Sequence, residues 1–565
     1  PRVSVQTYST IVSNWLQARA RVLRYPYTFS GSEHMKPSTL RIGHRYRPKR
    51  LAPEYDVIVI GSGMGGLTTA ALLSDLGKRV CVLEQHYTAG GYTHSYERNG
   101  YEWDVGVHYI GDVGTQTRTR RMFDFLSGGK LEWAPMADEY DRFYIGDKVF
   151  NAMAGKQAFR DNLVCQFPGE EHAIGVYMDL LQKVGRALSD LGMERVLKPW
   201  QRKLAAPVIK LRTPDFMYRS TYEVLSGLTE NQDLIATLCG QWGDMGLPPK
   251  QSAFMVHAMI ARHYLYGGYY PVGGSWQIAD SIIPKIQAVG GEVFTYARVV
   301  RILVEDDTVT GVEMADGHRI DCGTVISSAG IANTFETLLP AGVAKRYGYA
   351  EKLNAVRPSF AHLGVYIGLQ GTAEELGLPR TNFWIYPHND YDAAVDAFVK
   401  DRDAEFPVVY ISFPSAKDPD YPNRHPGTAT IEIVAPAPYE WFEQWKGTTW
   451  GKRGEDYEAF KTQLGERLMR HLYNKLPQLE GKVDYYEVST PLSTEWFAAY
   501  RRGELYGLDH TVERFRQEWL GPRTRIPGLW LTGQDTLTCG VTGAMMSGLL
   551  TTMAMVGMRR MGPLM

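Results

Sequence analysis

The chain has 565 residues, of which 44% are apolar and 22% are charged, and its formal net charge is −1. These values are ordinary for a globular protein and allow one large two-lobed unit or several domains. The near-neutral charge excludes nucleic-acid binding by the molecule as a whole. The five cysteines are scattered, with no C-x-x-C and no His pair at zinc spacing, so we expect a reducing compartment and no metal.

Residues 1–50 form a basic arm, with eight Arg and two Lys against the single acid Glu33. Apolar residues recur at helical spacing beside these arginines: Ile11, Trp15, Ala18 and Val22. Residues 9–23 can therefore lie on an anionic membrane surface, and a solvated arm is the alternative. We expect a cytoplasmic protein that associates peripherally with a membrane. The Arg-rich, acid-poor composition also resembles an organelle transit segment, so organelle targeting stays open.

Residues 55–84 predict a strand, a glycine turn, a helix and a second strand. Residues 56–60 are a short β-branched run typical of a buried parallel strand, and residues 67–76 are rich in Ala and Leu. Gly77 is placed to end the helix, and residues 79–84 supply the next strand. This order is a βαβ unit.

The turn Gly61-x-Gly63-x-x-Gly66 indicates dinucleotide binding. Gly61 permits the tight turn, Gly63 lets a pyrophosphate approach the backbone, and Gly66 lets the helix pack against the strand. The helix N-terminus offers free N–H groups to the phosphates. Glu84, about twenty residues beyond the glycines, is placed to accept both ribose hydroxyls of an adenosine. The alternative is a turn that only connects two strands.

Two further glycine-containing stretches follow. Gly90 and Gly91 would let backbone N–H groups reach a diphosphate or the edge of a flavin ring. Asn99-Gly100 lies between two alternating runs, which predicts a hairpin.

From about 136 to 265 the glycine motifs stop and helical patterns dominate, for example at 170–192 and 229–240. Residues 202–212 are basic and amphipathic, and we interpret them as a solvated helix edge, with a second membrane contact as the alternative. Residues 264–275 read as a loop that leads into a helix ending at Gly290-Gly291.

The second half of the chain predicts several strands and one long helix. The strands are expected at 292–295, 299–305, 309–314, 325–330, 360–369, 408–413 and 430–435, and the helix at 456–476. Residues 528–535 predict a last buried strand that runs into a turn. Residues 536–558 are uncharged, but their many Thr, Gly and Ser residues argue against a membrane span and favour a helix buried in the protein.

Several separated blocks together resemble the retinol saturases, within the larger group of FAD enzymes that includes phytoene desaturases and carotenoid isomerases. The blocks are 59–66, 83–86, 90–91, 103–111, 270–274, 412–419, 439–442 and 531–540. The likeness covers nearly all of residues 55–550. Residues 1–50 share no motif with the family.

The resemblance implies an α/β fold. It has a Rossmann-type FAD-binding domain like that of glutathione reductase, and a substrate domain of sheet plus helices. The implied division is 1–50 for the basic arm, 51–135, 265–335 and 484–565 for the FAD-binding domain, and 136–264 and 336–483 for the substrate domain.

The resemblance also implies a set of FAD-binding residues. Val299 would meet the adenine through its backbone, Asp535 would bond the ribityl or diphosphate region, and Gly540 to Thr542 would lie near the flavin. The full set is Gly61, Gly63, Gly65, Gly66, Glu84, Gln85, Gly90, Gly91, Tyr92, Val299, Gly533, Asp535, Gly540, Val541 and Thr542. One position departs from the wider group, which usually has Arg where this chain has Tyr92.

Only one dinucleotide motif is visible, so we expect one FAD and no nicotinamide domain, and the electron donor or acceptor is unknown. The favoured hypothesis is a reductase that adds hydride and a proton to a C=C bond of a retinoid, carotenoid or other apolar polyene or isoprenoid. A desaturase or cis/trans isomerase is the alternative, and a lipid-binding flavoprotein without turnover is a third. His108 and Tyr109 are the candidate proton donors, although a structural role for both is also open.

Overall fold

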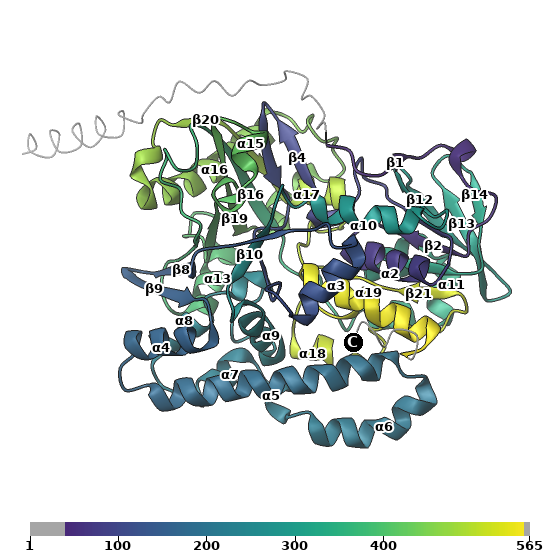
Figure 1. Cartoon of the computed structure of the whole chain (residues 1–565), viewed down its shortest axis with the longest axis horizontal. Helices are drawn as coiled ribbons and strands as arrows, with labels where there is room; N and C mark the ends of the chain where they lie inside the picture. The colour runs from purple at the N-terminus through teal and green to yellow at the C-terminus, as the bar shows by residue number, and fades with distance from the viewer. Residues whose placement is uncertain (1–39, 559–565) are drawn as a thin grey trace, which may run out of the picture. The chain divides into compact units, whose positions relative to one another are not determined.

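The computed structural model describes residues 40–558, and these residues pack as one compact unit (Figure 1). The predicted membrane-surface helix at 9–23 lies outside the described residues. Residues 40–50, which we expected in the basic arm, contribute a short strand, β1 (His44–Arg45). β1 pairs in parallel with β11 (Glu292–Thr295), so this part of the arm belongs to the folded unit.

A six-stranded parallel sheet carries the predicted βαβ unit. Its order is β1, β11, β3 (Val80–Leu83), β2 (Val57–Ile60), β15 (Val325–Ser327) and β21 (Leu529–Leu531). Every neighbouring pair is parallel. The strands predicted at 56–60, 79–84, 292–295, 325–330 and 528–535 are all confirmed in this sheet.

Both faces of this sheet are covered, which explains the continuous apolar runs of its strands. Val57 and Val59 pack on the side of helices α2 (Met64–Asp75), α10 (Gln277–Gln287) and α19 (Val541–Val556). Ile58 and Ile60 point to the other side, where they join the core beneath the antiparallel strands β12 (Val299–Glu305), β13 (Thr308–Met314) and β14 (Arg319–Asp321). The Rossmann-type fold is confirmed.

The second large sheet has seven strands and is mixed parallel and antiparallel. Its order is β20 (Val483–Ser489), β16 (His362–Gln370), β19 (Thr428–Pro436), β18 (Val409–Ser412), β17 (Asn382–Tyr386), β8 (Glu139–Ile145) and β9 (Lys148–Met153). The expectation that helices dominate from 136 missed β8 and β9, because β8 is completed by a parallel partner, β17, that comes much later in the chain. The predicted boundary at 484 falls inside β20, which pairs with β16. The remaining domain boundaries stay a prediction.

Two small sheets connect these layers. β4 (Ser95–Arg98) and β5 (Tyr101–Asp104) form the predicted hairpin, and Asn99 and Gly100 both have positive φ, 52° and 85°, as a type I′ turn requires. The segment 264–275, which we expected to be a loop, contains β10 (Gly268–Pro271) between β6 (Ile110–Gly111) and β7 (Trp133–Pro135). The Gly and Pro residues of this segment are typical of a loop, and both of the strands that pair with β10 are distant in sequence. The sequence pattern therefore did not reveal the strand.

The remaining helices are distributed around both sheets. They are α3 (Arg118–Ser127), α4 (Lys156–Gln166), α5 (Glu171–Val196), α6 (Pro199–Arg212), α7 (Thr221–Leu225), α8 (Gln232–Leu238), α9 (Phe254–Tyr264), α11 (Ala341–Arg346), α12 (Tyr349–Leu353), α13 (Tyr391–Lys400), α14 (Pro414–Lys417), α15 (Tyr421–Arg424), α16 (Glu455–Lys475), α17 (Pro491–Ala498) and α18 (Val512–Phe515). Among the described residues, no helix combines the length and apolar character that a membrane span needs. The uncharged C-terminal segment is instead the buried helix α19.

Candidate functional site

The glycine turn after β2 has the geometry of a phosphate-binding turn. Gly61 has a φ of 96°, and a Cβ on Gly66 would overlap the Gly61 carbonyl oxygen, so neither position tolerates a side chain. Gly63 is the N-cap of α2, and a Cβ there would meet nothing within 4 Å. The helix N-terminus therefore opens onto free space at the position where a pyrophosphate is expected.

Three distant segments meet at this turn. Gly63 forms a parallel bridge with Gly90, and a Cβ on Gly91 would come 2.8 Å from the Gly63 Cα. A Cβ on Gly65 would come 2.7 Å from the backbone of Gly533. Glycine at these positions is what allows residues 61–66, 90–91 and 533 to approach so closely.

Glu84 is fixed against the same turn. Its Oε2 accepts hydrogen bonds from the Ser62 N–H (2.9 Å) and hydroxyl (2.8 Å), and its Oε1 accepts from the His86 N–H (2.8 Å). Oε1 therefore keeps a lone pair for a further donor, whereas Oε2 already accepts two hydrogen bonds. The carboxylate is thus oriented at the end of β3, where the ribose of a bound dinucleotide is expected.

Two of the predicted cofactor residues have buried polar atoms without a partner. Among the described residues, neither the Tyr92 hydroxyl nor Thr542 Oγ1 has a hydrogen bond, although both are buried. Thr542 lies in the first turn of α19, whose N-cap Gly540 supplies no side-chain cap. Buried polar atoms are rarely left unpaired, so a ligand with polar atoms fits this place.

The other predicted cofactor residues differ in burial and in hydrogen bonding. Both Asp535 oxygens accept backbone hydrogen bonds, from Ile331 (2.8 Å) and Leu508 (3.0 Å), which fixes the carboxylate beside the turn after β15. Val299 is buried at the start of β12, whereas Gln85 is exposed. Val541, next to Thr542, is half-buried. Their roles stay predictions.

His108 lies between the cofactor turn and the seven-stranded sheet. Nearby Gly106 packs on Tyr92, since a Cβ there would come 3.1 Å from the Tyr92 Cβ. The His108 Nδ1 lies 2.8 Å from Glu432 Oε2 on β19, and the His108 side chain is 18% exposed. Burial and the nearby Lys417 lower the pKa of His108 to about 3, so the ring is neutral at physiological pH.

Glu432 keeps its proton at neutral pH, because burial raises its pKa to about 8. Its Oε1 accepts the Asp104 N–H (2.8 Å), which leaves Oε2 to carry the proton and donate to His108 Nδ1. The neutral imidazole then holds its own proton on Nε2. This pair can donate a proton from Nε2 and replace it through Nδ1.

Tyr109, the other candidate, is more enclosed than His108. Its hydroxyl lies within hydrogen-bond distance of Asp141 (3.0 Å) and Asp244 (3.3 Å), and its ring stacks on Tyr264 at 4.1 Å. Burial and the two carboxyl groups raise the pKa of Tyr109 well above its usual value. The structure therefore gives Tyr109 the partners of a core residue.

Lys417, the last residue of α14, binds the backbone at His108. Its Nζ donates to the His108 carbonyl oxygen (2.9 Å), to Ser412 Oγ (2.8 Å) and to Asn382 Oδ1. Burial lowers its pKa to about 7. A buried lysine bonded to the His108 peptide fixes the position of the imidazole.

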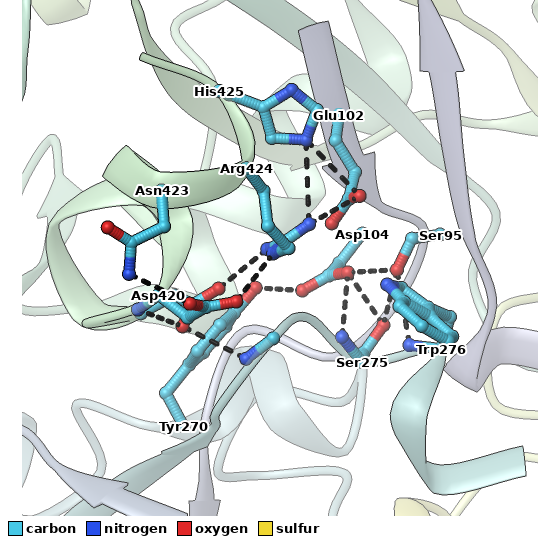
Figure 2. Close-up of polar contacts among 12 residues, drawn as sticks. Ser95, Glu102, Asp104, Tyr270, Ser275, Trp276, Asp420, Asn423, Arg424 and His425 are labelled. Carbon is cyan, nitrogen blue, oxygen red and sulfur yellow. Dashed lines mark hydrogen bonds and ion pairs between the residues drawn. The ribbon is translucent and has the colours of Figure 1, made fainter. Parts of the chain in front are cut away.

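Asp104 ties the same segment to the loop after β10. Figure 2 shows its carboxyl group accepting hydrogen bonds from Ser95, Ser275 and Tyr270, including 2.7 Å from the Ser275 hydroxyl. Burial and the neighbouring Glu432 raise the pKa of Asp104 to about 7. These bonds anchor the end of β5, four residues before His108.

A second part of this network surrounds Arg424. Its guanidinium donates to Glu102 (2.7 Å) and Asp418 (2.7 Å), and His425 lies 3.4 Å from Glu102 (Figure 2). Glu97, Glu102 and His425 are close enough to share a cation. The Arg424 guanidinium already supplies the positive charge at Glu102, so this group is explained as a structural ion-pair cluster.

Glu432, Lys417 and Asp104 were not among the predicted site residues. Glu432 could have been found as a lone acid within an otherwise apolar buried strand, 428–436. Lys417 and Asp104 lie within blocks that carry the resemblance, but nothing in the sequence shows that they meet at His108.

The chain is similar to several known proteins. Residues 59–126 match the NAD(P)-binding Rossmann-like domain. The all-trans-retinol 13,14-reductase of Macaca fascicularis is 38% identical over 537 residues, covering 90% of this chain and 87% of that protein. A protein of Danio rerio named inactive all-trans-retinol 13,14-reductase is 32% identical over 89% of this chain. A chloroplastic prolycopene isomerase of Daucus carota is 24% identical over 88% of the chain and 79% of its own length.

Solved structures share the fold at low identity. A putrescine oxidase variant superposes with a TM-score of 0.59 at 14% identity, covering 89% of this chain and 99% of the oxidase. An oxidoreductase from Methanosarcina mazei gives a TM-score of 0.55 at 17% identity, covering 87% of this chain and 98% of its own. These likenesses support the two-sheet architecture alone.

Proposed function

Because the chain belongs to the all-trans-retinol 13,14-reductase (retinol saturase) family, we propose that it reduces one C=C bond of a retinoid or a related apolar polyene. The observation that carries this proposal is a dinucleotide-binding glycine turn in the same molecule as a half-buried, neutral imidazole backed by a protonated carboxyl group. The family supplies the substrate class, and the site supplies the proton.

FAD is the cofactor, and the residues present fit it. The α2 N-terminus and the glycine backbone at 61–66 and 90–91 would hold the diphosphate, Glu84 the adenosine ribose, and Tyr92 and Thr542 the parts of the cofactor closer to its ring. Reduced FAD, when bound, supplies a hydride to one carbon of the conjugated bond.

The chain's own residues would complete the addition. His108 Nε2 donates a proton to the neighbouring carbon, and the Glu432 hydroxyl passes its proton to His108 Nδ1. Lys417 and Asp104 hold the His108 segment in place through the bonds described above. A neutral donor suits an apolar substrate, because no unpaired charge has to be buried against the polyene.

Two other outcomes have specific support. A relative named prolycopene isomerase favours double-bond isomerisation as the second candidate, and a relative named inactive favours a binding protein without turnover as the third. The same FAD site serves all three, so only the product separates them.

The test is an anaerobic single turnover. The FAD-loaded chain is reduced chemically, mixed with all-trans-retinol, and followed by flavin absorbance and by mass spectrometry of the retinoid. We expect flavin reoxidation together with a product two hydrogen atoms heavier. Rearranged retinoid of unchanged mass would support isomerisation, and unchanged retinoid with reduced flavin would support a binding protein; either result contradicts the reductase proposal.

A further inference from the structure

Helix α6 carries an unusually exposed apolar stripe. The four most exposed large apolar side chains among residues 40–558 are Trp200 (61%), Leu204 (73%), Val208 (58%) and Leu211 (88%). They occupy positions i, i+4, i+8 and i+11 of one helix, so they share one face. No residue of α6 is buried. We expected this segment to be a solvated helix edge, but a solvated helix would not collect its apolar residues on the outside.

Ion pairs attach α6 to the rest of the chain, from Arg202 on the face opposite the stripe and from Arg212 at its flank. Arg202 bonds Glu194 at 2.8 Å and Arg212 bonds Asp190 at 2.9 Å, both acids on α5. Figure 1 shows α6 at the lower edge of the view, with α5 between it and α19. These contacts fix which face α6 turns outward, namely the apolar one.

The charges along the stripe indicate the kind of partner. α6 contains no acidic residue. Lys203 and Lys210 are exposed beside the stripe, and in the part of the chain that the structure describes neither forms an ion pair. An apolar face bordered by free lysines matches a lipid surface with anionic headgroups. A second copy of this chain matches poorly, because a two-fold contact would bring like charges together.

We propose that α6 lies in the plane of an anionic membrane, with Trp200, Leu204, Val208 and Leu211 inserted among the lipids. At 14 residues α6 is about 21 Å long, too short to cross a bilayer, so it binds at the interface. The contact brings the enzyme to the phase in which an apolar polyene dissolves. The inference does not depend on the proposed reaction, because membrane binding is measured without turnover.

The test is co-sedimentation of the full-length, FAD-loaded chain with vesicles of phosphatidylcholine alone or with added phosphatidylserine. We expect binding to the phosphatidylserine vesicles, and an at least tenfold loss of binding in Leu204→Glu/Val208→Glu. Lys203→Glu/Lys210→Glu should lose the preference for phosphatidylserine. The matched control Val149→Glu/Val399→Glu changes exposed apolar residues on β9 and α13 and should bind like the wild type.

A second readout follows the stripe directly. Brominated lipids should quench part of the tryptophan fluorescence of the wild type, and this part should be absent in Trp200→Phe. Unchanged flavin absorbance in every variant shows that the fold is intact. A wild type that binds no vesicles overturns the proposal, as does a loss of binding caused by Trp15→Glu in the N-terminal arm but not by the α6 variant. A dimer that Leu204→Glu/Val208→Glu dissociates would assign the stripe to self-association instead.

Discussion

His108 and Tyr109 are neighbours in the chain, yet their side chains meet different partners. His108 reaches a protonated carboxyl group on β19 and stays partly exposed, whereas the Tyr109 hydroxyl is bonded to two acids inside the core. The sequence could not rank the two, because the ranking depends on residues that lie 32, 135 and 324 positions away in the chain. The structure favours His108 as the proton donor.

His108→Asn should lower kcat by about 100-fold or more, the usual contribution of a positioned general acid, and leave KM for the retinoid nearly unchanged. Asn keeps a polar group of similar size but has no proton to transfer. Tyr109→Phe, which removes only the enclosed hydroxyl, is the matched comparison and should keep most of the rate. Similar losses in both variants would show that the proton comes from elsewhere.

The pH dependence should follow Glu432. Burial raises the pKa of Glu432 to about 8, so the carboxyl group holds its proton below that pH and loses it above. We therefore expect kcat/KM to fall as the pH rises through about 8. Glu432→Gln preserves the donor to His108 Nδ1 but cannot ionise, and its profile should lack this decline while its rate is lower throughout. An unchanged alkaline decline in the variant would count against Glu432.

Gly63 offers a test of the phosphate position. A Cβ there meets nothing within 4 Å, so Gly63→Ala should leave the stability of the flavin-free protein unaffected. The methyl group would occupy the space of the pyrophosphate, so we expect FAD affinity to fall at least tenfold, measured by fluorescence titration. Gly323→Ala, also in open space, is the control and should bind FAD normally. Equal affinity in all three proteins would place the phosphates elsewhere.

At the scale of elements, the contact between α2 and α19 holds the site together. A Cβ on Gly548 would come 2.7 Å from the Thr68 Cβ and 2.8 Å from the Gly65 carbonyl oxygen. The two helices approach closely only because this position has no side chain.

Gly548→Ala should destabilise the protein by about 1–3 kcal/mol through overpacking, measured by urea unfolding of the flavin-free chain. Gly175→Ala, in α5 with nothing within 4 Å of the added Cβ, should instead be neutral or slightly stabilising. If the two variants had the same midpoint, the close approach of α2 and α19 would not be needed for stability.

The elements that were predicted correctly are those whose signal lies within a short stretch of the sequence. The inner strands β2, β3 and β15 of the parallel sheet are buried and read as apolar runs, and the Asn99-Gly100 turn fixes its own hairpin. β8 and β10 were missed because each pairs with a strand far away in the chain, and β9 is an edge strand that pairs only with β8. The spacing of the apolar residues in α6 shows that they share one face. Whether that face is buried or exposed depends on the ion pairs between α6 and α5, which the sequence does not reveal.

At the scale of the whole molecule, the predicted cofactor site could be assembled from motifs, since glycine spacing reports backbone geometry directly. Residues 61–66, 90–91 and 533 do come together. The acid and base groups behind His108 could not be predicted, because Glu432, Lys417 and Asp104 come from three separate segments that meet only in the folded chain. Contacts between residues that are distant in the chain produce no periodic pattern in the sequence.

The central claim is that one FAD is held where these distant segments converge, and its most direct test is the flavin content of the purified full-length chain. The flavin released on denaturation is identified and quantified against protein concentration. We predict a yellow protein that releases one FAD per chain. A colourless chain that takes up no FAD when it is supplied in excess would contradict the account.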